Sequence, residues 1–229
     1  MKKHLVFLTG AGISAESGLK TFRDADGLWN GYDIHEVATP RAFQKNPQLV
    51  LDFYNMRRRD VAHAMPNEAH QTIAALENDF KVSIVTQNID DLHERGGSSF
   101  VLHLHGEIFK MRSVKDENKI FDIKDDIQVG QLAEDGGQLR PHIVWFEEPV
   151  PMIELAAALI STADIFVVIG TSLQVYPAAG LLDYVKDNVP KFVIDKNIPE
   201  IRTVRNCVAI EKPATHGMKE LVKHLQSYL

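Results

Sequence analysis

A glycine-rich turn directly after an apolar run is the first feature of this sequence with the chemistry of a ligand site. Residues 5–8 are apolar, and Gly10, Ala11 and Gly12 follow them. Glycine lets the main chain approach an anion without a side-chain clash, and a helix that begins here would point its positive N-terminus at that anion. The turn fits the relaxed dinucleotide pattern with Ala15 in its last position, but no acidic residue follows at the usual distance. We therefore expect a phosphate cradle, with a ligand-free turn as the alternative.

Polar residues suited to acid-base and hydrogen-bond chemistry follow two later apolar runs. Gln87, Asn88 and Asp90 come first, and their amides and carboxylate are suited to sugar hydroxyls and a carboxamide. Helix capping is the alternative role for Asn88 and Asp90. His105 follows the next run, and a histidine with a pKa of about 6.5 is suited to act as a general base. An ordinary core or surface histidine is the alternative.

The elements that must position these residues form a predicted parallel sheet. Apolar, β-rich runs alternate with helix-like stretches and cover residues 5–8, 82–85, 100–104, 165–169, 192–194 and 208–210. Runs that are apolar on both faces and separated by helices predict a doubly wound α/β fold. Such sheets bind ligands at the carboxyl ends of their strands, where the glycine turn, residues 87–90, His105 and residues 170–172 would converge.

The order of short motifs along nearly the whole chain resembles the sirtuin family. These motifs are GAGISAESGLKTFRDADGLW from Gly10 to Trp29, Thr86-Gln87-Asn88-Ile89-Asp90, His105-Gly106, residues 141–146, Gly170-Thr171-Ser172 and Val175-Tyr176-Pro177-Ala178. The resemblance implies a Rossmann-like core that binds NAD. It also implies NAD-dependent deacylation of acylated protein lysines, which yields nicotinamide, 2′-O-acyl-ADP-ribose and free lysine.

The resemblance further implies roles for individual residues. The catalytic residues would be His105, Asn88, Asp90 and Arg23. The residues that bind NAD would be Gly10, Ala11, Gly12, Ser14, Glu16, Thr21, Phe22, Arg23, Trp29, Gln87, Asn88, Ile89, Asp90, Gly170, Thr171, Ser172, Asp195, Lys196, Asn197 and Ala214. Sirtuins usually carry an asparagine near the adenosine ribose, and here either Asp195 or Asn197 takes that position. An aspartate there disfavours a ribose phosphate, so we expect NAD rather than NADP.

An arginine on the apolar face of a predicted helix suggests an anionic substrate group. Thr39-Pro40 and Asn46-Pro47 each predict a helix start, and the second helix carries Tyr54 and Arg57 on its apolar stripe. A buried guanidinium is costly unless an anion accepts its hydrogen bonds. The pair also resembles the sirtuin subgroup that removes malonyl, succinyl or glutaryl groups, which implies desuccinylase and demalonylase activity. An arginine that snorkels or pairs with a core carboxylate, or a merely basic turn with its two arginine neighbours, is the alternative.

The expected peptide-binding segment departs from the family pattern. We expect the substrate peptide to add as a strand against Ile143, Val144 and Phe146. Most sirtuins continue Phe-Gly-Glu, whereas this chain has Phe146-Glu147-Glu148. The extra carboxylate adds negative charge near a lysine substrate.

The segment after His105 lacks the cysteines of the family. Sirtuins ordinarily place two Cys-x-x-Cys pairs there, but residues 107–140 contain none, and Ser113 and Asp116 stand near the first expected pair. A structural zinc site normally needs four cysteine or histidine ligands, and the pair His103 and His105 has no further ligands nearby. We expect no metal. The module would instead hold an apolar cluster drawn from Ile108, Phe109, Ile120, Phe121, Ile123, Ile127, Val129 and Leu132.

Length and composition are compatible with one catalytic domain. We expect a Rossmann-like core formed by residues 1–28, 66–106 and 141–229, a helical cofactor and acyl-binding segment at 29–65, and a small module at 107–140. The net charge of −6 argues against general nucleic-acid affinity. No apolar run is long enough for a membrane span, and the N-terminus does not read as a signal peptide. We expect a cytoplasmic monomer with no membrane attachment.

Other functions stay open alongside protein deacylation. The activated ribose could accept another nucleophile, which would make the chain a protein ADP-ribosyltransferase. A non-catalytic NAD-binding sensor is a further alternative, although Gln87, Asn88, Asp90 and His105 argue against it. An ordinary dehydrogenase fits least well.

Overall fold

The core of the molecule is a parallel sheet of six strands in the order β3-β2-β1-β7-β8-β9. The structure is a computed structural model that describes residues 2–21, 29, 31–199 and 204–229. The strands are β1 His4–Thr9, β2 Lys81–Thr86, β3 Val101–His103, β7 Ile165–Ile169, β8 Lys191–Asp195 and β9 Cys207–Glu211. All six coincide with the predicted runs, and the prediction of a doubly wound α/β fold is confirmed.

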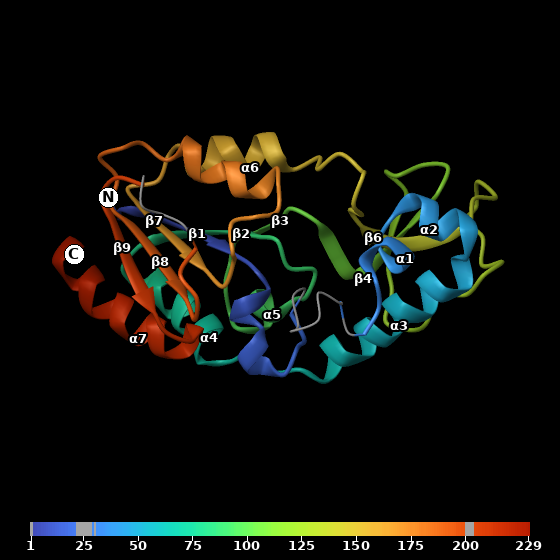
Figure 1. The fold of residues 1–229 in the computed structure, drawn as a ribbon, viewed down its shortest axis with the longest axis horizontal. Helices are drawn as coiled ribbons and strands as arrows, with labels where there is room; N and C mark the ends of the chain where they lie inside the picture. Colours follow the sequence, from blue (N-terminus) through green and yellow to red (C-terminus); the bar gives the residue numbers. More distant parts are fainter. Residues whose placement is uncertain (1, 22–28, 30, 200–203) are drawn as a thin grey trace.

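Helices cover both faces of this sheet, because the strands are apolar on both sides. Figure 1 shows α6 (Ile153–Ile160) along one face and α4 (Glu68–Ala75) and α7 (Ala214–Leu225) along the other. Leu5, Phe7 and Met218 belong to the core beneath α4 and α7, whereas Val6 and Leu8 pack on the α6 side. Short turns complete the covering: α5 (Leu92–Arg95), η3 (Leu76–Asn78), η4 (Ala178–Tyr184) and η5 (Gln226–Tyr228).

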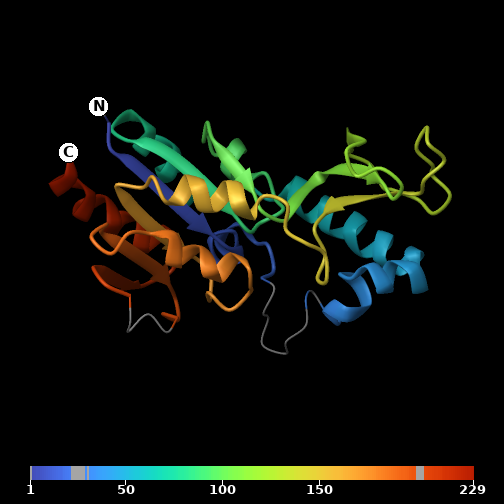
Figure 2. The ribbon, with the colours of Figure 1, turned by 90° about the horizontal axis from the view of Figure 1, so that it is seen from above.

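A second lobe lies beyond one end of the sheet (Figures 1 and 2). It contains an antiparallel sheet of three strands, with β4 (Gly106–Ser113) between β5 (Ile120–Asp122) and β6 (Leu139–Ile143). Three helices pack there: α1 (Ile34–Val37), α2 (Pro40–Lys45) and α3 (Pro47–His63). The predicted helix starts are confirmed, since the Thr39 and Asn46 side chains accept hydrogen bonds from backbone amides two residues past each first proline.

Two buried polar side chains of α3 fasten the three-stranded sheet to this helix. Arg58, which is 1% exposed, donates to the carbonyl oxygens of Ile108 and Asp125. Asn55 exchanges two hydrogen bonds with the backbone of Ile127. The alternative of a merely basic turn at Arg57 and its neighbours is wrong, because Arg57 and Arg58 are both buried.

The predicted apolar cluster of the small module is only half correct. Ile108 and Ile127 are buried, and Phe109 and Ile123 are partly buried against the core. The remaining members are exposed by 38–57% of their surface: Ile120, Phe121, Val129 and Leu132. Ile120 and Phe121 are neighbours in β5, an edge strand whose three residues are all exposed, and Val129 and Leu132 lie in the connection between β5 and β6.

A hydrogen-bond cluster includes Ser113, which stands near the position of the first cysteine pair that sirtuins usually carry. Ser113 donates to Asp135 Oδ1 at 2.9 Å, and the Gly137 amide donates to the same oxygen at 2.8 Å. The bond from the Gly137 amide, aided by Ser113 and nearby lysines, lowers the pKa of Asp135. Among the residues that the structure describes, no three His, Cys, Asp or Glu side chains gather as a metal site. No described helix is long and apolar enough to cross a bilayer.

Candidate active site

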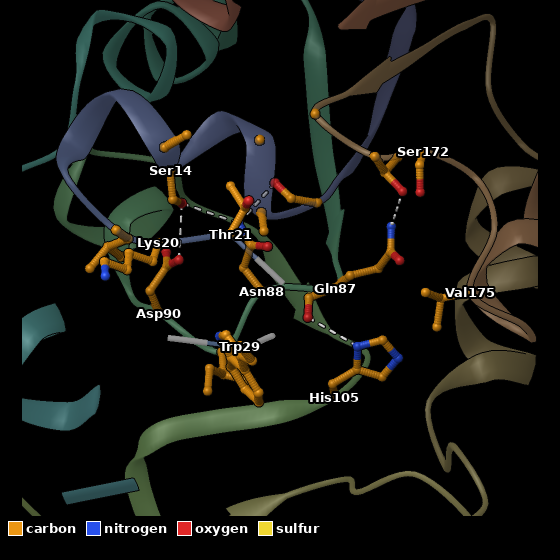
Figure 3. Close-up of a pocket in the computed structure, with 18 of the residues that line it drawn as sticks. Ser14, Lys20, Thr21, Trp29, Gln87, Asn88, Asp90, His105, Ser172 and Val175 are labelled. Atoms are coloured by element: carbon orange, nitrogen blue, oxygen red, sulfur yellow. Dashed lines mark hydrogen bonds between the residues drawn. The ribbon is translucent and has the colours of Figure 1, made fainter. Parts of the chain in front are cut away.

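One cavity of about 750 Å³ lies where the strands β1, β2, β7 and β8 end. It brings together most of the predicted site residues from distant parts of the chain, as the switch-point rule for α/β sheets requires. Its lining includes Gly10, Ala11, Gly12, Ser14, Thr21, Trp29, Gln87, Asn88, Ile89, Asp90, His105, Gly170, Thr171, Ser172, Asp195, Lys196, Asn197 and Ala214. Figure 3 shows part of this lining, with Ser14 and Asp90 on one side and Gln87 and His105 on the other.

The glycines of the first turn serve the packing of two loops. A Cβ atom at Gly10 would lie 2.7 Å from the Gly170 carbonyl oxygen, and one at Gly12 would lie 2.6 Å from the Gly170 Cα atom. Gly170 has a φ of 65°, a conformation that favours glycine. The loops after β1 and β7 thus lie in direct contact beside the cavity.

The prediction of a helix directly after the glycine turn is wrong, because no α-helix begins there. Two short 3₁₀ turns follow instead, at Ala11–Ile13 and Ala15–Ser17. Ser14 connects them, and its 2% exposed side chain faces the loop after β2. Backbone amides of these turns, rather than the end of a long helix, are thus the groups next to the cavity.

Ser14 ties together the two polar residues expected to hold a nicotinamide ribose and carboxamide. Its hydroxyl donates to Asp90 Oδ2 at 2.9 Å and accepts from Asn88 Nδ2 at 3.2 Å (Figure 3). Burial raises the pKa of Asp90, although hydrogen bonds from the Leu92 amide and Ser14 oppose this shift. Helix α5 begins after Asp91, and Asn88 does not cap it, so the capping alternative holds only for Asp90, which accepts from the Leu92 amide.

His105 is oriented as a base that faces the cavity. Its Nδ1 atom lies 3.0 Å from the Gln87 carbonyl oxygen, and a carbonyl only accepts, so Nδ1 carries the proton (Figure 3). This tautomer leaves the Nε2 lone pair available. Burial lowers the pKa of His105, and the hydrogen bond to Gln87 opposes that shift. The imidazole is therefore neutral near pH 7.

His103 has a different environment from His105. Its Nδ1 atom donates to the Asn88 carbonyl oxygen at 2.9 Å, and its Nε2 atom lies 2.8 Å from Glu94 Oε1. Burial disfavours the charged ring, but the hydrogen bond and charge of Glu94 outweigh burial and raise the pKa of His103. Both ring nitrogens have protein partners, so His103 does not form a metal pair with His105.

The end of β8 and the chain segments that follow β8 and β9 form another part of the lining, which includes Asp195, Lys212 and Ala214. Asp195 and Asn197 both line the cavity, and one carboxylate oxygen of Asp195 accepts a bond from the Asn197 amide. Glu16 does not line the cavity. Its carboxylate instead accepts two hydrogen bonds from Thr215 in the first turn of α7.

Tyr54 and Arg57 reach the same cavity from α3. Tyr54 is fully buried, and this burial raises the pKa of its phenol, which therefore stays a hydrogen-bond donor. The Arg57 guanidinium lies 5.5 Å from the Trp29 ring centroid and 3.4 Å from the Lys20 carbonyl oxygen. Its side chain is 7% exposed, and its ion pair with the half-exposed Asp60 is long, at 3.9 Å. A largely buried cation thus borders the cavity.

The predicted peptide segment Ile143, Val144 and Phe146 also lines the cavity. The Val144 amide donates to the His105 carbonyl, and the Phe146 amide donates to the Ala38 carbonyl. The lining also includes Val175, Tyr176 and Pro177. The bond from the Val144 amide to the His105 carbonyl places the peptide segment directly beside His105.

Two of the predicted site residues, Phe22 and Arg23, lie outside the residues that the structure describes. A second class of site residues was not predicted. In this class, Lys20 lines the cavity without a strong sequence signal for this position, whereas Glu147, which the sequence placed near the substrate, also lines it. Thr86 is buried at the end of β2, where its hydroxyl accepts from the Asn88 amide and from Thr9.

Comparison with known proteins gives the family. A model of the Sir2 family matches residues 10–177. The chain belongs to the Sir2 family. It is 52% identical over 223 residues to an "NAD-dependent protein deacylase" of Helicobacter pylori strain 26695, with 97% of each chain covered. A protein of the same description from Bacteroides thetaiotaomicron is 49% identical, with 96% of each chain covered.

Solved Sir2 structures have the same fold. A Sir2 homologue in complex with NAD has a TM-score of 0.87 and 40% identity, covering 99% of this chain and 91% of that one. A Sir2 complex with a p53 peptide and NAD⁺ has a TM-score of 0.81 and 30% identity, covering 99% and 95%. The sirtuin resemblance predicted from the motifs is confirmed.

Proposed function

We propose that this sirtuin is an NAD-dependent protein-lysine deacylase that removes acetyl groups and also succinyl and malonyl groups. The observation that carries the proposal is the convergence of Gln87, Asn88, Asp90 and His105 on one cavity with the glycine loops. Relatives described as NAD-dependent protein deacylases, about half identical over most of the chain, support the same activity. Bound NAD would supply an activated ribose that accepts the acyl group and releases nicotinamide.

The lining of the cavity fits NAD chemically. Backbone amides of the turns at residues 10–14 and 170–172 are suited to the phosphates. Asn88 and Asp90 offer an amide and a carboxylate to a carboxamide and a ribose. Asp195 or Asn197 would accept from the adenosine ribose, and the charge of Asp195 would favour NAD over NADP.

His105 would act as the general base of the reaction. The Nε2 lone pair, set by the bond from Nδ1 to the Gln87 carbonyl, would take a proton from a ribose hydroxyl. The lowered pKa of His105 keeps the ring neutral and able to accept this proton at pH 7. Asn88 would hold the reacting ribose in place, supported by Ser14 and the Gly10 carbonyl.

Tyr54 and Arg57 would bind the carboxylate of a succinyl or malonyl group. The largely buried Arg57 guanidinium borders the cavity, and a carboxylate that enters there would accept charge-assisted hydrogen bonds from it. The protonated phenol of Tyr54 would donate a further hydrogen bond. An acetyl group lacks the carboxylate and would leave this end of the cavity without an anion.

The substrates would be acylated lysines of proteins, bound as an added strand beside Ile143, Val144 and Phe146. The Sir2 homologue that was solved with a peptide and NAD⁺ supports this kind of partner. We also expect the enzyme to act as a cytoplasmic monomer that has no nucleic-acid or membrane partner and needs no zinc, in keeping with a net charge of −6 and a single cysteine.

The test is a reaction of purified protein with NAD and matched acetyl-lysine and succinyl-lysine peptides. Chromatography and mass spectrometry should find nicotinamide and deacylated peptide in equal amounts, and none without the acyl peptide. ADP-ribose attached to protein without deacylation would favour the transferase alternative. Failure of every acyl peptide to release nicotinamide would favour a non-catalytic sensor.

A further inference from the structure

Two adjacent glutamates at the end of the peptide segment have different surroundings. The Glu148 carboxylate is largely buried, lies 2.6 Å from Arg140 Nη1 and accepts from the Trp145 amide. Burial opposes its charge, but Arg140 outweighs this effect and lowers the pKa of Glu148. Glu147 lines the cavity, and its side chain is 42% exposed. Of these two glutamates, Glu147 therefore presents the solvent-accessible carboxylate beside the peptide segment.

The backbone of Glu147 has an uncommon conformation for its residue type. Its φ is 72°, in the left-handed region where a side chain costs about 1–2 kcal/mol relative to glycine. Within the described parts of the chain, no hydrogen bond engages the Glu147 amide or the Val144 carbonyl. These two groups border the cavity and are available to an added peptide strand. The Glu147 side chain thus sits next to the peptide backbone, not merely on a remote surface.

The charge of Glu147 is only weakly neutralised by its neighbour. Glu147 Oε2 lies 3.1 Å from Arg41 Nε, and the Arg41 side chain is 84% exposed. Ion pairs between exposed side chains contribute at most about 1 kcal/mol. A cationic side chain of a substrate can therefore share the carboxylate with Arg41 or displace Arg41 from it.

We infer that Glu147 makes this enzyme favour substrates with an arginine or lysine close to the acylated lysine. The inference rests on the proposed deacylase function and on the strand mode of peptide binding. Attraction to a rim carboxylate acts mainly on the capture of the peptide, so selectivity should appear in kcat/KM and weaken with salt. If Arg41 were the dominant group instead, peptides with flanking aspartate or glutamate would react faster.

The test compares acetyl-lysine peptides whose flanking residues are arginine, alanine or glutamate, at low and high salt. The wild type should have the highest kcat/KM on the arginine peptide. Glu147→Gln should lower the ratio of arginine to alanine peptides about threefold, and Glu147→Lys should lower it about tenfold. Glu154→Gln, which removes an exposed carboxylate from the first turn of α6, should leave the ratio unchanged.

The outcomes separate this inference from the proposed function. An unchanged ratio in Glu147→Lys, with all peptides still deacylated, overturns the role of Glu147 alone. Preference of the wild type for the glutamate peptide, abolished in Arg41→Gln, assigns the selectivity to Arg41 and also overturns it. Loss of deacylation on every peptide in the wild type contradicts the proposed function instead. Glu147→Gly, which suits the positive φ, provides a second charge-removing variant that should fold well.

Discussion

Replacement of Arg57 by methionine should shift the selectivity of the enzyme strongly from succinyl towards acetyl substrates. The Arg57 side chain is 7% exposed, and the Asp60 carboxylate that lies 3.9 Å from its guanidinium belongs to a side chain that is 46% exposed. A carboxylate that enters this site would accept charge-assisted hydrogen bonds from a largely desolvated guanidinium. Such bonds contribute about 1.5–3 kcal/mol each, and a bidentate pair after desolvation is worth roughly 3 kcal/mol. The ratio of succinyl to acetyl kcat/KM should therefore fall more than about a hundredfold.

The assay measures kcat/KM for matched succinyl-lysine and acetyl-lysine peptides by chromatographic detection of the deacylated product. Methionine fills a similar volume without charge, so the helix should persist. Arg59→Met is the matched control, because Arg59 lies on the same helix but pairs with Asp126 at the surface, and it should leave the ratio near the wild-type value. Tyr54→Phe should lower the ratio by less, about three- to tenfold, since it removes one neutral hydrogen bond. A ratio in Arg57→Met within threefold of the wild type would refute the carboxylate role of Arg57.

Three further predictions concern stability and metal content. Gly170→Ala should lower the free energy of unfolding by about 3 kcal/mol in urea titrations, because its Cβ atom would lie 2.4 Å from a backbone nitrogen at a φ of 65°. Gly18 also has a positive φ but has open space around it, so Gly18→Ala should lower the free energy of unfolding by only about 1 kcal/mol. Equal losses in the two variants would contradict the close packing of the loops after β1 and β7. Metal analysis should find far less than one zinc per chain, and one zinc per chain would contradict the expectation of a zinc-free module. Ser113→Ala should lower the midpoint of thermal unfolding by roughly 3 °C, because it removes the hydrogen bond to Asp135. Burial lowers the pKa of His70 to about 4, below the unfolded value, so the unfolded chain binds more protons between these values and stability falls as the pH drops from about 6.5 to 4. In His70→Gln, the decrease in the free energy of unfolding between pH 6.5 and pH 4 should be smaller by up to about 3 kcal/mol. A pH dependence equal to that of the wild type would contradict this role of His70.

The sheet and its ligand edge were predictable because each strand is apolar on both faces. The runs at residues 165–169 and 192–194 therefore differ from the observed strands by at most one residue at either end. The carboxyl ends of parallel strands meet at one edge, so the loops after them had to converge. His105 and Asn88 could be placed at one site on this basis before their contacts were known.

Long-range side-chain contacts were not predictable from local patterns. Glu16 carried the same signal as its neighbours in the first motif, yet it binds Thr215, which lies 199 residues away in the chain. Alternation along the small module indicated strands, but it could not indicate that β5 would lie at the edge of the sheet with all its residues exposed. Phe121 was therefore assigned to the core although it is 38% exposed. Arg58 was missed for the opposite reason, because its buried partners are backbone carbonyls of another segment.

The most direct test of the central claim is the formation of O-acyl-ADP-ribose from an acyl peptide and NAD by the wild type and by His105→Ala. Mass spectrometry should detect this product in an amount equal to the deacylated peptide. The variant should form it at least about a hundredfold more slowly, because it loses the general base that faces the cavity. Turnover by the variant within tenfold of the wild type, or ADP-ribose found only on protein, would contradict the account.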